Sequence, residues 1–320
     1  MRLTRALTFA SALVASAVGL SLPTQAEESH ITVLLDWFVN PDHGPLIVAE
    51  ELGYFKEVGL DVELVAPADP NDPPKLVAAG KAEIAIGYQP QLHVQVAEGL
   101  PLVRFGTLVA TPLNSLVALK DGPIKDLKDL KGKKVGYSVG GFEDALLGAM
   151  LTSEGLSLDD VELVNVNFSL SPAVISGQVD AVIGAFRNFE LNQMDIAGHP
   201  GVAFYPEEHG VPVYDELIFI TATDMRDDPR LAAFLAAVEK GTHYIVNHPQ
   251  KSWDIFRGHS PDLDDELNKR AWFATIPRFD MTPAALDSGR YARFAEFLKT
   301  QGLIKETLPV SSYAIAVGQE

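Results

Sequence analysis

The chain of 320 residues contains no cysteine. Disulfide bonds, thiol nucleophiles, zinc sites with cysteine ligands and lipid attachment to an N-terminal cysteine are therefore excluded. Basic residues are also scarce, because 25 Lys and Arg stand against 43 Asp and Glu and the formal net charge is −18. Proteins that bind nucleic acids or anionic membranes need a basic face. We therefore expect no nucleic-acid partner.

Catalytic and metal-binding motifs are missing as well. The sequence has no Gly-x-Ser-x-Gly elbow, no His-Glu-x-x-His pair and no Walker loop, and its eight histidines lack the spacing of metal ligands. These absences argue against a hydrolase or a metalloenzyme. We expect no catalytic residues, no metal site and no cofactor.

Residues 1–26 have the pattern of a secretory signal peptide. Arg2 and Arg5 precede an apolar stretch over 6–22, and cleavage is predicted after Ala26. A transmembrane anchor is the alternative, but the apolar stretch is short and several Thr and Ser residues interrupt it. No later run of about 18 apolar residues follows. We expect a periplasmic mature protein that is not inserted in a membrane.

The organisation of the chain predicts an α/β fold with two lobes. The length suggests about two domains, and strand patterns alternate with helical ones, as in parallel α/β layers. Residues 76–87 match residues 173–184, and each copy reads as a helix ended by a glycine, an acidic residue and a buried strand. We expect lobe 1 over 27–112 and 218–320, and lobe 2 over 113–217.

Two segments are expected to connect the lobes, over 109–119 and 214–223. After Asp224 the apolar residues recur at three-four spacing, which is typical of helices. We expect this C-terminal tail to be helical, to pack on lobe 1 and to contribute no ligand contact.

Candidate binding residues follow the predicted strands of both lobes. In open α/β sheets, ligands gather outside the carboxyl ends of the strands. Tyr88 comes directly after the first copy of the repeat, and Phe186 comes two residues after the second copy. The two residues should therefore lie at equivalent strand ends. Asp36 and Trp37 directly follow the first strand, and Glu190 follows the second copy of the repeat. Trp37 would stack on a flat ring while Glu190 accepts hydrogen bonds from its amines.

Each of these residues also has a purely structural alternative. Trp37 can fill the core beneath the sheet, Asp36 can cap a helix, and Glu190 can lie on the surface of a helix. His93, one helical turn after Gln89, can be a core or a surface histidine.

A glycine-rich loop over 136–141 leads from a strand into a predicted helix over 142–153. Backbone N–H groups at the start of a helix can hold an anion or a carbonyl oxygen, although an ordinary strand–helix turn has the same spacing. Glu143 and Asp144 occupy the first turn and already balance the helix dipole. The loop therefore favours a neutral acceptor over a phosphate or a sulfonate.

Several of these segments resemble the thiamine-pyrimidine family. That family contains the binding proteins of ABC importers for pyrimidine precursors of thiamine, and the eukaryotic thiamine-pyrimidine synthase. The resemblance implies a type II periplasmic binding protein fold with two lobes, a hinge and a ligand cleft between them. It extends from Ile31 to the last helices and is carried by Leu-Asp-Trp and Asn-Pro-Asp-His within 35–43, by 53–62, by 68–76 and by 136–143.

The resemblance also implies roles for single residues. Trp37, Tyr88 and Tyr137 resemble aromatic residues that stack on the pyrimidine, and Glu190 resembles the carboxylate that receives its amino group. Asp36 falls where the family often has an amide or an acid facing the ligand. The candidate ligand-binding residues are Asp36, Trp37, His43, Tyr88, His93, Asn114, Tyr137, Gly140, Phe142, Asn188 and Glu190.

Two departures argue against the synthase reaction. His93 falls at the position of the histidine that the synthase consumes, but Gln89 stands where the synthase has a lysine that forms a Schiff base with pyridoxal phosphate. The cysteine cluster that holds the synthase's iron is absent too, because the chain has no cysteine.

The leading hypothesis is therefore a periplasmic binding protein, and not an enzyme. It would capture an aminopyrimidine of the formylaminopyrimidine or hydroxymethylpyrimidine type and deliver it to an ABC permease and its ATPase. Its lobes would close about segments near 111–115 and 216–220, and we expect a monomer. The alternative keeps the fold but binds a sulfonate, a nitrate or a riboflavin-like molecule, for which Arg187 is the only candidate cation beside the mapped cleft walls.

Overall fold

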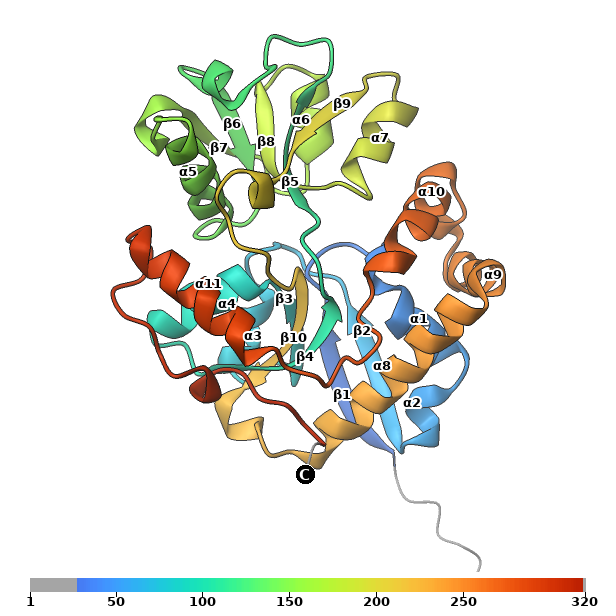
Figure 1. Cartoon of the computed structure of the whole chain (residues 1–320). Helices are drawn as coiled ribbons and strands as arrows, with labels where there is room; N and C mark the ends of the chain where they lie inside the picture. Colours follow the sequence, from blue (N-terminus) through green and yellow to red (C-terminus); the bar gives the residue numbers. More distant parts are fainter. Residues whose placement is uncertain (1–27, 319–320) are drawn as a thin grey trace, which may run out of the picture.

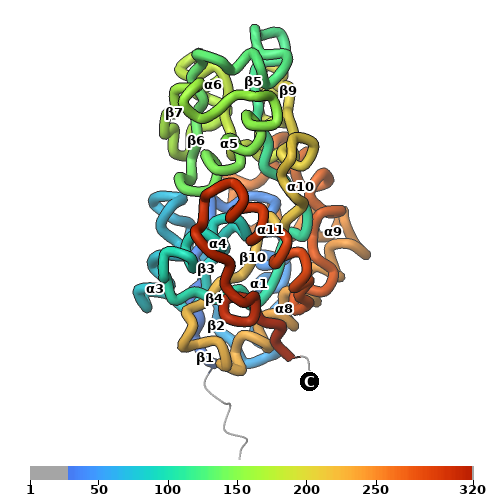
Figure 2. Tube along the Cα trace, turned by 60° about the vertical axis from the view of Figure 1, so that its left-hand side comes forward, coloured from blue at the N-terminus to red at the C-terminus, as the bar shows by residue number. Residues whose placement is uncertain are grey.

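The computed structural model describes residues 28–318, so the predicted signal peptide lies outside the described residues. These residues form two lobes, each built on a five-stranded β-sheet (Figure 1). Figure 2 shows the lobes stacked one above the other, with the crossing segments between them.

The sheet of the larger lobe has the strand order β2-β1-β3-β10-β4. Strand β1 is parallel to β2 and β3, whereas β10 is antiparallel to both of its neighbours. The strands are β1 (Ser29–Leu34), β2 (Leu60–Val65), β3 (Ile84–Gly87), β4 (Leu102–Val109) and β10 (Leu217–Ala222).

The sheet of the smaller lobe has the order β7-β6-β8-β5-β9. Strand β6 is parallel to β7 and β8, and β5 is antiparallel to β8 and β9. The strands are β5 (Asn114–Leu119), β6 (Lys134–Tyr137), β7 (Glu162–Asn165), β8 (Ala181–Phe186) and β9 (Gly201–Phe204).

Helices cover both faces of the larger sheet, with α1, α2 and α8 on one side and α3, α4 and α11 on the other (Figure 1). Helix α10 packs against α7 of the smaller lobe. The helices are α1 (Gly44–Glu51), α2 (Tyr54–Glu57), α3 (Pro73–Ala78), α4 (Gln89–Ala97), α5 (Glu143–Ser153), α6 (Leu170–Ile175), α7 (Glu190–Ile196), α8 (Pro229–Asn247), α9 (Pro249–His259), α10 (Glu266–Thr275) and α11 (Ser288–Thr300).

The internal repeat forms the same unit in each lobe. Helix α3 ends before Gly80 and leads into β3, and helix α6 ends before Gly177 and leads into β8. Gly80 and Gly177 have φ angles of 66° and 74°, which lie in the left-handed region that an L side chain rarely adopts. The two glycines thus end each helix and turn the chain into a buried strand, as the sequence predicts.

The prediction of parallel layers is only partly right. Strand β5 enters the smaller lobe from the larger one, and β10 returns in the opposite direction. Each inserts between two strands of its new sheet, β5 between β8 and β9, and β10 between β3 and β4. Because each crossing strand arrives from the other lobe, it runs antiparallel to its neighbours. Both sheets are therefore mixed.

The prediction of an entirely helical tail is wrong. Between α10 and α11, and again after α11, the chain runs beside β4. Phe279 and Ala314 form isolated bridges with Val109 and Arg104, and the Thr107 N–H donates to the Pro283 carbonyl at 2.9 Å. An exposed edge strand leaves unpaired backbone groups, and these extended segments pair them. The tail does pack on the larger lobe, as expected.

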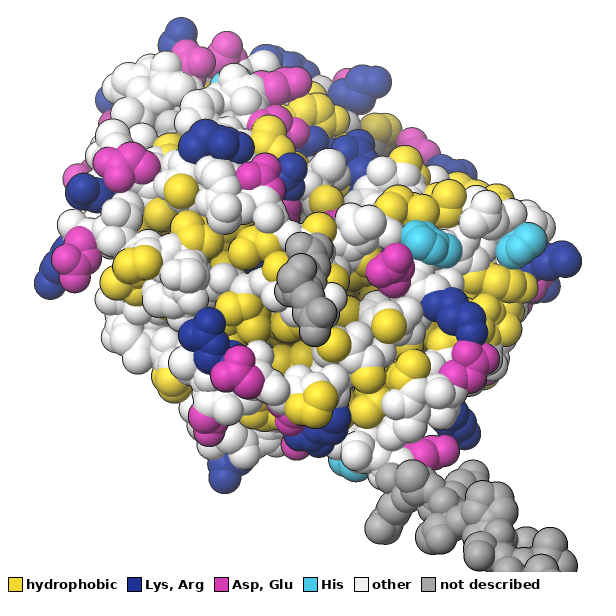
Figure 3. Space-filling model, turned by 60° about the horizontal axis from the view of Figure 1, so that its bottom comes forward, with side chains coloured by type: hydrophobic (Ala, Val, Ile, Leu, Met, Phe, Trp, Pro, Cys, Tyr) yellow, Lys and Arg dark blue, Asp and Glu magenta, His cyan; other side chains and the backbone are white. Residues whose placement is uncertain are grey.

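The surface carries both signs of charge. Figure 3 shows acidic and basic side chains interspersed around hydrophobic ones on the lower face of the larger lobe. No helix within residues 28–318 is both long and apolar enough to span a membrane.

Candidate functional site

A cavity of about 20 Å³ lies between the two lobes, so in this arrangement the lobes are nearly closed on each other. Both lobes contribute to its lining, through the loop after β1, the end of β3, the end of β8 and the first turns of α5 and α7. The lining residues are Asp36, Trp37, Asn40, Asp42, Tyr88, Glu143, Leu170, Gly184, Phe186, Phe189 and Glu190.

Asp36 is held by two buried hydrogen bonds in the larger lobe. The Tyr88 hydroxyl donates to Oδ2 of Asp36 at 2.9 Å, and Nε2 of His43 lies 2.9 Å from Oδ1. The Asn40 N–H donates to Nδ1 of His43, so the proton of the neutral imidazole sits on Nε2 and is donated to Asp36. Burial, reinforced by Asp36, raises the pKa of Tyr88 well above its usual value. Tyr88 thus stays a neutral donor, and the side chains of Tyr88 and His43 fix the carboxylate at the cavity wall.

Aromatic rings from both lobes surround the cavity. Tyr88 stacks on Phe142 with ring centroids 4.9 Å apart and meets the edge of Phe186 at 6.3 Å. Trp37 meets Phe168 edge-on at 4.6 Å. In each of these pairs, one ring comes from the larger lobe and the other from the smaller lobe. The lobes therefore meet through aromatic contacts, which are favourable surroundings for a flat ring.

Glu190 and Glu143 are the carboxyl groups that the smaller lobe contributes. Oε2 of Glu190 accepts the Phe186 N–H at 2.7 Å, and Oε2 of Glu143 accepts the Ser138 and Val139 N–H groups at 2.8 and 3.1 Å. Burial is the largest cause that raises the pKa of each of the two carboxyl groups to about 8. Both groups therefore exchange a proton near neutral pH.

Asn188 links the two lobes beside the cavity. Its Nδ2 donates to Oδ1 of Asp42 and to Oγ1 of Thr275, both at 2.7 Å. Asp42 belongs to the loop after β1, Asn188 to the loop after β8, and Thr275 to the end of α10. Burial raises the pKa of Asp42 to about 6. This polar cluster holds the lobes together, and the tail takes part in it.

The two crossing segments are joined by Glu216. Its Oε2 accepts the Leu113 and Asn114 N–H groups at 2.6 and 2.8 Å, and burial raises its pKa to about 7. Arg187 donates to the carbonyls of Leu113 and Asn114 and pairs with Glu207 at 2.6 Å. The outgoing crossing is therefore fixed to the return crossing and to the smaller lobe.

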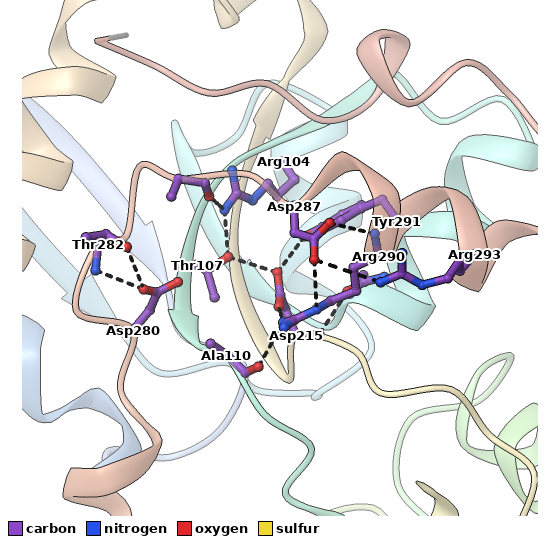
Figure 4. Close-up of polar contacts among 12 residues, drawn as sticks. Arg104, Thr107, Ala110, Asp215, Asp280, Thr282, Asp287, Arg290, Tyr291 and Arg293 are labelled. Carbon is purple, nitrogen blue, oxygen red and sulfur yellow. Dashed lines mark hydrogen bonds and ion pairs between the residues drawn. The ribbon is translucent and has the colours of Figure 1, made fainter.

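Asp215 fixes the return crossing to the tail (Figure 4). It accepts from Thr107 at 3.1 Å and from Tyr291 at 3.2 Å, and it pairs with Arg290. Arg290 also donates to the carbonyl of Ala110 at 2.9 Å. Both crossings are thus tied to α11, next to the point where they leave the larger lobe.

Four of the predicted ligand-binding residues line the cavity, namely Asp36, Trp37, Tyr88 and Glu190. The other predicted residues are not among the lining residues. His43 supports Asp36, Phe142 stacks on Tyr88, Asn188 bridges the lobes, Asn114 accepts the Gly184 N–H, Gly140 donates to Asn71, and Tyr137 packs beside the core.

His93 lies furthest from the predicted role. It is 2% exposed and packs against the rings of Tyr291, Phe294 and Tyr313. Burial lowers its pKa to about 3, so it is a neutral core histidine, which was the structural alternative. Its neighbour Gln89 uses Oε1 to accept the Asp215 N–H at 2.8 Å.

The sequence did not mark several lining residues as ligand contacts. Asn40 and Asp42 stand in the motif after the first strand, so their position was a signal that could have found them. Glu143 was interpreted only as a helix-dipole residue. Thr275 lies 233 residues from Asp42, and no sequence pattern connects the two.

Comparison with known proteins identifies the family. The profile described as "NMT1/THI5 like" matches residues 40–252. The chain belongs to the NMT1/THI5-like family. It is 53% identical to a protein of Haemophilus influenzae named as a thiamine biosynthesis protein, over 93% of this chain and 95% of that one. It is 36% identical to the formylaminopyrimidine-binding protein of Halalkalibacterium halodurans, over 70% and 69%.

The NMT1/THI5-like family also includes proteins named as enzymes. The 4-amino-5-hydroxymethyl-2-methylpyrimidine phosphate synthase of Legionella pneumophila is 26% identical, over 85% of this chain and 88% of that one. Family membership alone therefore leaves both a binding protein and an enzyme as candidates.

Solved structures establish the fold of this NMT1/THI5-like chain. The alkanesulfonate-binding protein of Xanthomonas axonopodis pv. citri superimposes with a TM-score of 0.72 at 14% identity, over 90% of this chain and 99% of that one. The ligand-binding component of an ABC-type import system of Staphylococcus aureus superimposes with a TM-score of 0.68 at 11% identity, over 89% of this chain and 96% of that one. The protein has the two-lobed type II periplasmic binding protein fold, and the comparisons together support a binding protein.

Proposed function

We propose that this protein captures a thiamine-precursor aminopyrimidine, of the formylaminopyrimidine or hydroxymethylpyrimidine type, in the cavity between its lobes. It then delivers the ligand to an ABC permease and its ATPase. In this proposal it is a periplasmic monomer, residues 27–112 and 218–320 form one lobe, and residues 113–217 form the other. The relative named as a formylaminopyrimidine-binding protein supports the ligand class.

The observation that carries the proposal is the lining of the cavity. It combines aromatic rings with four carboxyl groups and, among the described residues, no Lys or Arg. Carboxylates accept hydrogen bonds from ring amines, whereas a sulfonate or nitrate would need cations or free N–H groups. Arg187, the cation considered for an anionic ligand, is paired with Glu207 and with backbone carbonyls. The alternative with an anionic ligand is therefore disfavoured.

A binding role also agrees with the environment of His93. A histidine that is consumed as a substrate must be reachable from the site, but His93 is enclosed by core aromatic rings. Gln89, which cannot form a Schiff base, is engaged with the backbone of the return crossing. We therefore propose that the protein is not a synthase.

The binding mechanism follows from the contacts between the lobes. The ligand enters while the lobes are apart, and closure about the crossings at 111–115 and 216–220 places its ring between the aromatic walls. Closure forms the hydrogen bonds of Asn188 with Asp42 and Thr275. Glu190 and Asp36 then accept from the amines of the ring in surroundings from which water is excluded.

A thermal-shift screen of the chain from residue 27 onward tests the proposal. Formylaminopyrimidine or hydroxymethylpyrimidine at a hundredfold excess over its dissociation constant should add about 2.7 kcal/mol of stability. Taurine, nitrate, riboflavin and thiamine serve as comparison ligands. A shift with taurine or nitrate alone would leave the fold intact and discard the pyrimidine assignment.

The variant Glu190→Gln tests the residue assigned to the amino group. The amide keeps the shape of the side chain but loses the charged acceptor. We expect affinity for the aminopyrimidine to fall by roughly ten- to a hundredfold, the value of a buried charged hydrogen bond. Isothermal titration calorimetry measures the change. Unaltered affinity in a folded Glu190→Gln variant would refute the role of Glu190.

A further inference from the structure

The glycine-rich loop before α5 has already used its N–H groups. Ser138 and Val139 both donate to Oε2 of Glu143. The Gly140 N–H donates to Oδ1 of Asn71, at 3.0 Å. Backbone N–H groups at the start of a helix form a favourable site for an anion. In this protein, two of those groups bind a carboxylate that the chain itself provides.

Glu143 is positioned as part of the cavity wall. Its side chain is buried and, together with Gly184, lines the cavity. A Cβ atom at Gly184 would lie only 2.4 Å from Oε1 of Glu143. Gly184 has a φ angle of 99°, and its N–H donates to Asn114. The absence of a side chain on β8 therefore makes room for the carboxyl group.

The groups that face Glu143 are acidic or neutral. Asp144 follows it on the same helix, Glu216 approaches from the return crossing, and the Tyr88 hydroxyl approaches from the end of β3. Asp36, Asp42 and Glu190 are the other carboxyl groups of the lining. An added phosphate would meet these carboxyl groups and would find the loop N–H groups taken.

We propose that Glu143 occupies the anion position of the glycine loop and thereby restricts the cavity to unphosphorylated pyrimidines, excluding their phosphate esters. The inference rests on the proposed function and specifies its substrate class. It also gives Glu143 a specificity role that differs from ligand capture by Glu190. Relatives named as synthases of a pyrimidine phosphate share the family, so the exclusion would separate a carrier of the free pyrimidine from proteins that handle the ester.

The proton on Glu143 does not alter this argument. Burial raises the pKa of Glu143 to about 8, so most of the population is neutral near pH 7. The hydrogen bonds from Ser138 and Val139 go to Oε2, and a neutral carboxyl group still has a carbonyl oxygen that accepts them. Occupation of the loop is therefore maintained in both protonation states.

The test compares two probes, 4-amino-5-hydroxymethyl-2-methylpyrimidine and its phosphate ester, by calorimetry on wild type and variants. Wild type should bind the alcohol at least roughly a hundredfold more tightly than the ester, because the phosphate of the ester finds the loop N–H groups occupied by Glu143 and meets the other carboxyl groups of the lining. Glu143→Ala frees the two N–H groups, so it should narrow this ratio at least roughly tenfold. Millimolar inorganic phosphate should raise the melting temperature of Glu143→Ala but not that of wild type.

Two matched variants separate charge from occupation of the loop. Asp144→Asn removes a carboxylate from the same helical turn. Neither carboxylate oxygen of Asp144 accepts a hydrogen bond from the loop, so the ratio of alcohol affinity to ester affinity should stay near that of wild type. Glu143→Gln removes the charge but keeps an oxygen that accepts both N–H groups, and it should change the ratio less than Glu143→Ala does. Thermal unfolding of each variant verifies that it is folded.

The outcomes distinguish this inference from the proposed function. If wild type binds the alcohol and the ester within threefold, or if folded Glu143→Ala gains neither ester nor phosphate binding, the inference is overturned while the proposed function stands. If wild type binds neither the alcohol nor formylaminopyrimidine, the proposed function fails, and the specificity role of Glu143 fails with it.

Discussion

Replacing Asp36 by alanine is expected to lower the free energy of unfolding by about 2–6 kcal/mol and to abolish measurable pyrimidine binding. The substitution leaves two buried donors, the Tyr88 hydroxyl and Nε2–H of His43, without an acceptor. A buried donor without an acceptor costs about 1–3 kcal/mol. Binding is lost because the carboxylate that faces the ligand is removed and its supporting side chains are free to reorient. Urea unfolding and calorimetry measure the two effects.

Two milder variants provide the controls. Tyr88→Phe removes one donor and leaves the Asp36–His43 hydrogen bond intact, so it should cost about 1.5–3 kcal/mol of stability, the value of one hydrogen bond to a charged group. Asp36→Asn keeps the shape of the side chain and one acceptor oxygen. Its free energy of unfolding should lie between those of wild type and Asp36→Ala. An Asp36→Ala variant that is as stable as Tyr88→Phe would show that the carboxylate does not hold both donors.

The sequence predicted the parts of the fold that depend on local chemistry. The glycines that end α3 and α6 need φ angles that other residues avoid, so the repeated helix–Gly–strand unit is visible in the sequence. The direction of β10 cannot be seen in the sequence, because a strand carries the same apolar pattern whether it runs parallel or antiparallel to its neighbours. The extended tail beside β4 was missed for a related reason. It is held by backbone pairing with β4, which leaves no side-chain period.

The candidate site divides in the same way. Asp36, Trp37, Tyr88 and Glu190 line the cavity because they follow strand ends, and strand ends of two facing sheets converge. Their roles in ligand binding stay predictions. Thr275 could not be found, because its contact with Asp42 depends on how α10 packs between the lobes.

Buried and charged groups are the hardest to assign from sequence. His93 and Glu143 both lie within helices next to strand ends, yet one is enclosed in the core and the other lines the cavity. The difference arises from tertiary packing. His93 points toward the tail that covers its helix, and Gly184 leaves room for the carboxyl group of Glu143.

The free energy of unfolding of the ligand-free protein is expected to fall by at least about 3 kcal/mol between about pH 5 and about pH 8.5. Burial raises the pKa of Glu143 and of Glu190 from 4.5 to about 8, and raises that of Glu216 to about 7. The native protein therefore holds protons that the unfolded chain releases near pH 4–5. The associated stability is fully present below the unfolded pKa and is lost as pH rises through the folded pKa. Urea titrations across this interval measure the decline.

Glu190→Gln removes one of these titrating groups. The slope of the unfolding free energy against pH should then decrease by up to about 1.36 kcal/mol per pH unit, the value of one proton. A wild-type stability that is constant or rises from about pH 5 to about pH 8.5 would contradict the raised pKa values. A variant with the wild-type slope would exclude Glu190 as a contributor.

The same protonation should make ligand binding tighter as the pH rises toward about 8. A ring amine donates to the charged carboxylate of Glu190 better than to its neutral form, so binding lowers the pKa of Glu190 and releases a proton. Calorimetry in buffers of different ionisation enthalpy would detect that proton. The ligand-free protein thus loses stability in the same pH interval in which its affinity for the ligand rises. Both changes depend on the loss of the proton from the buried carboxyl group of Glu190.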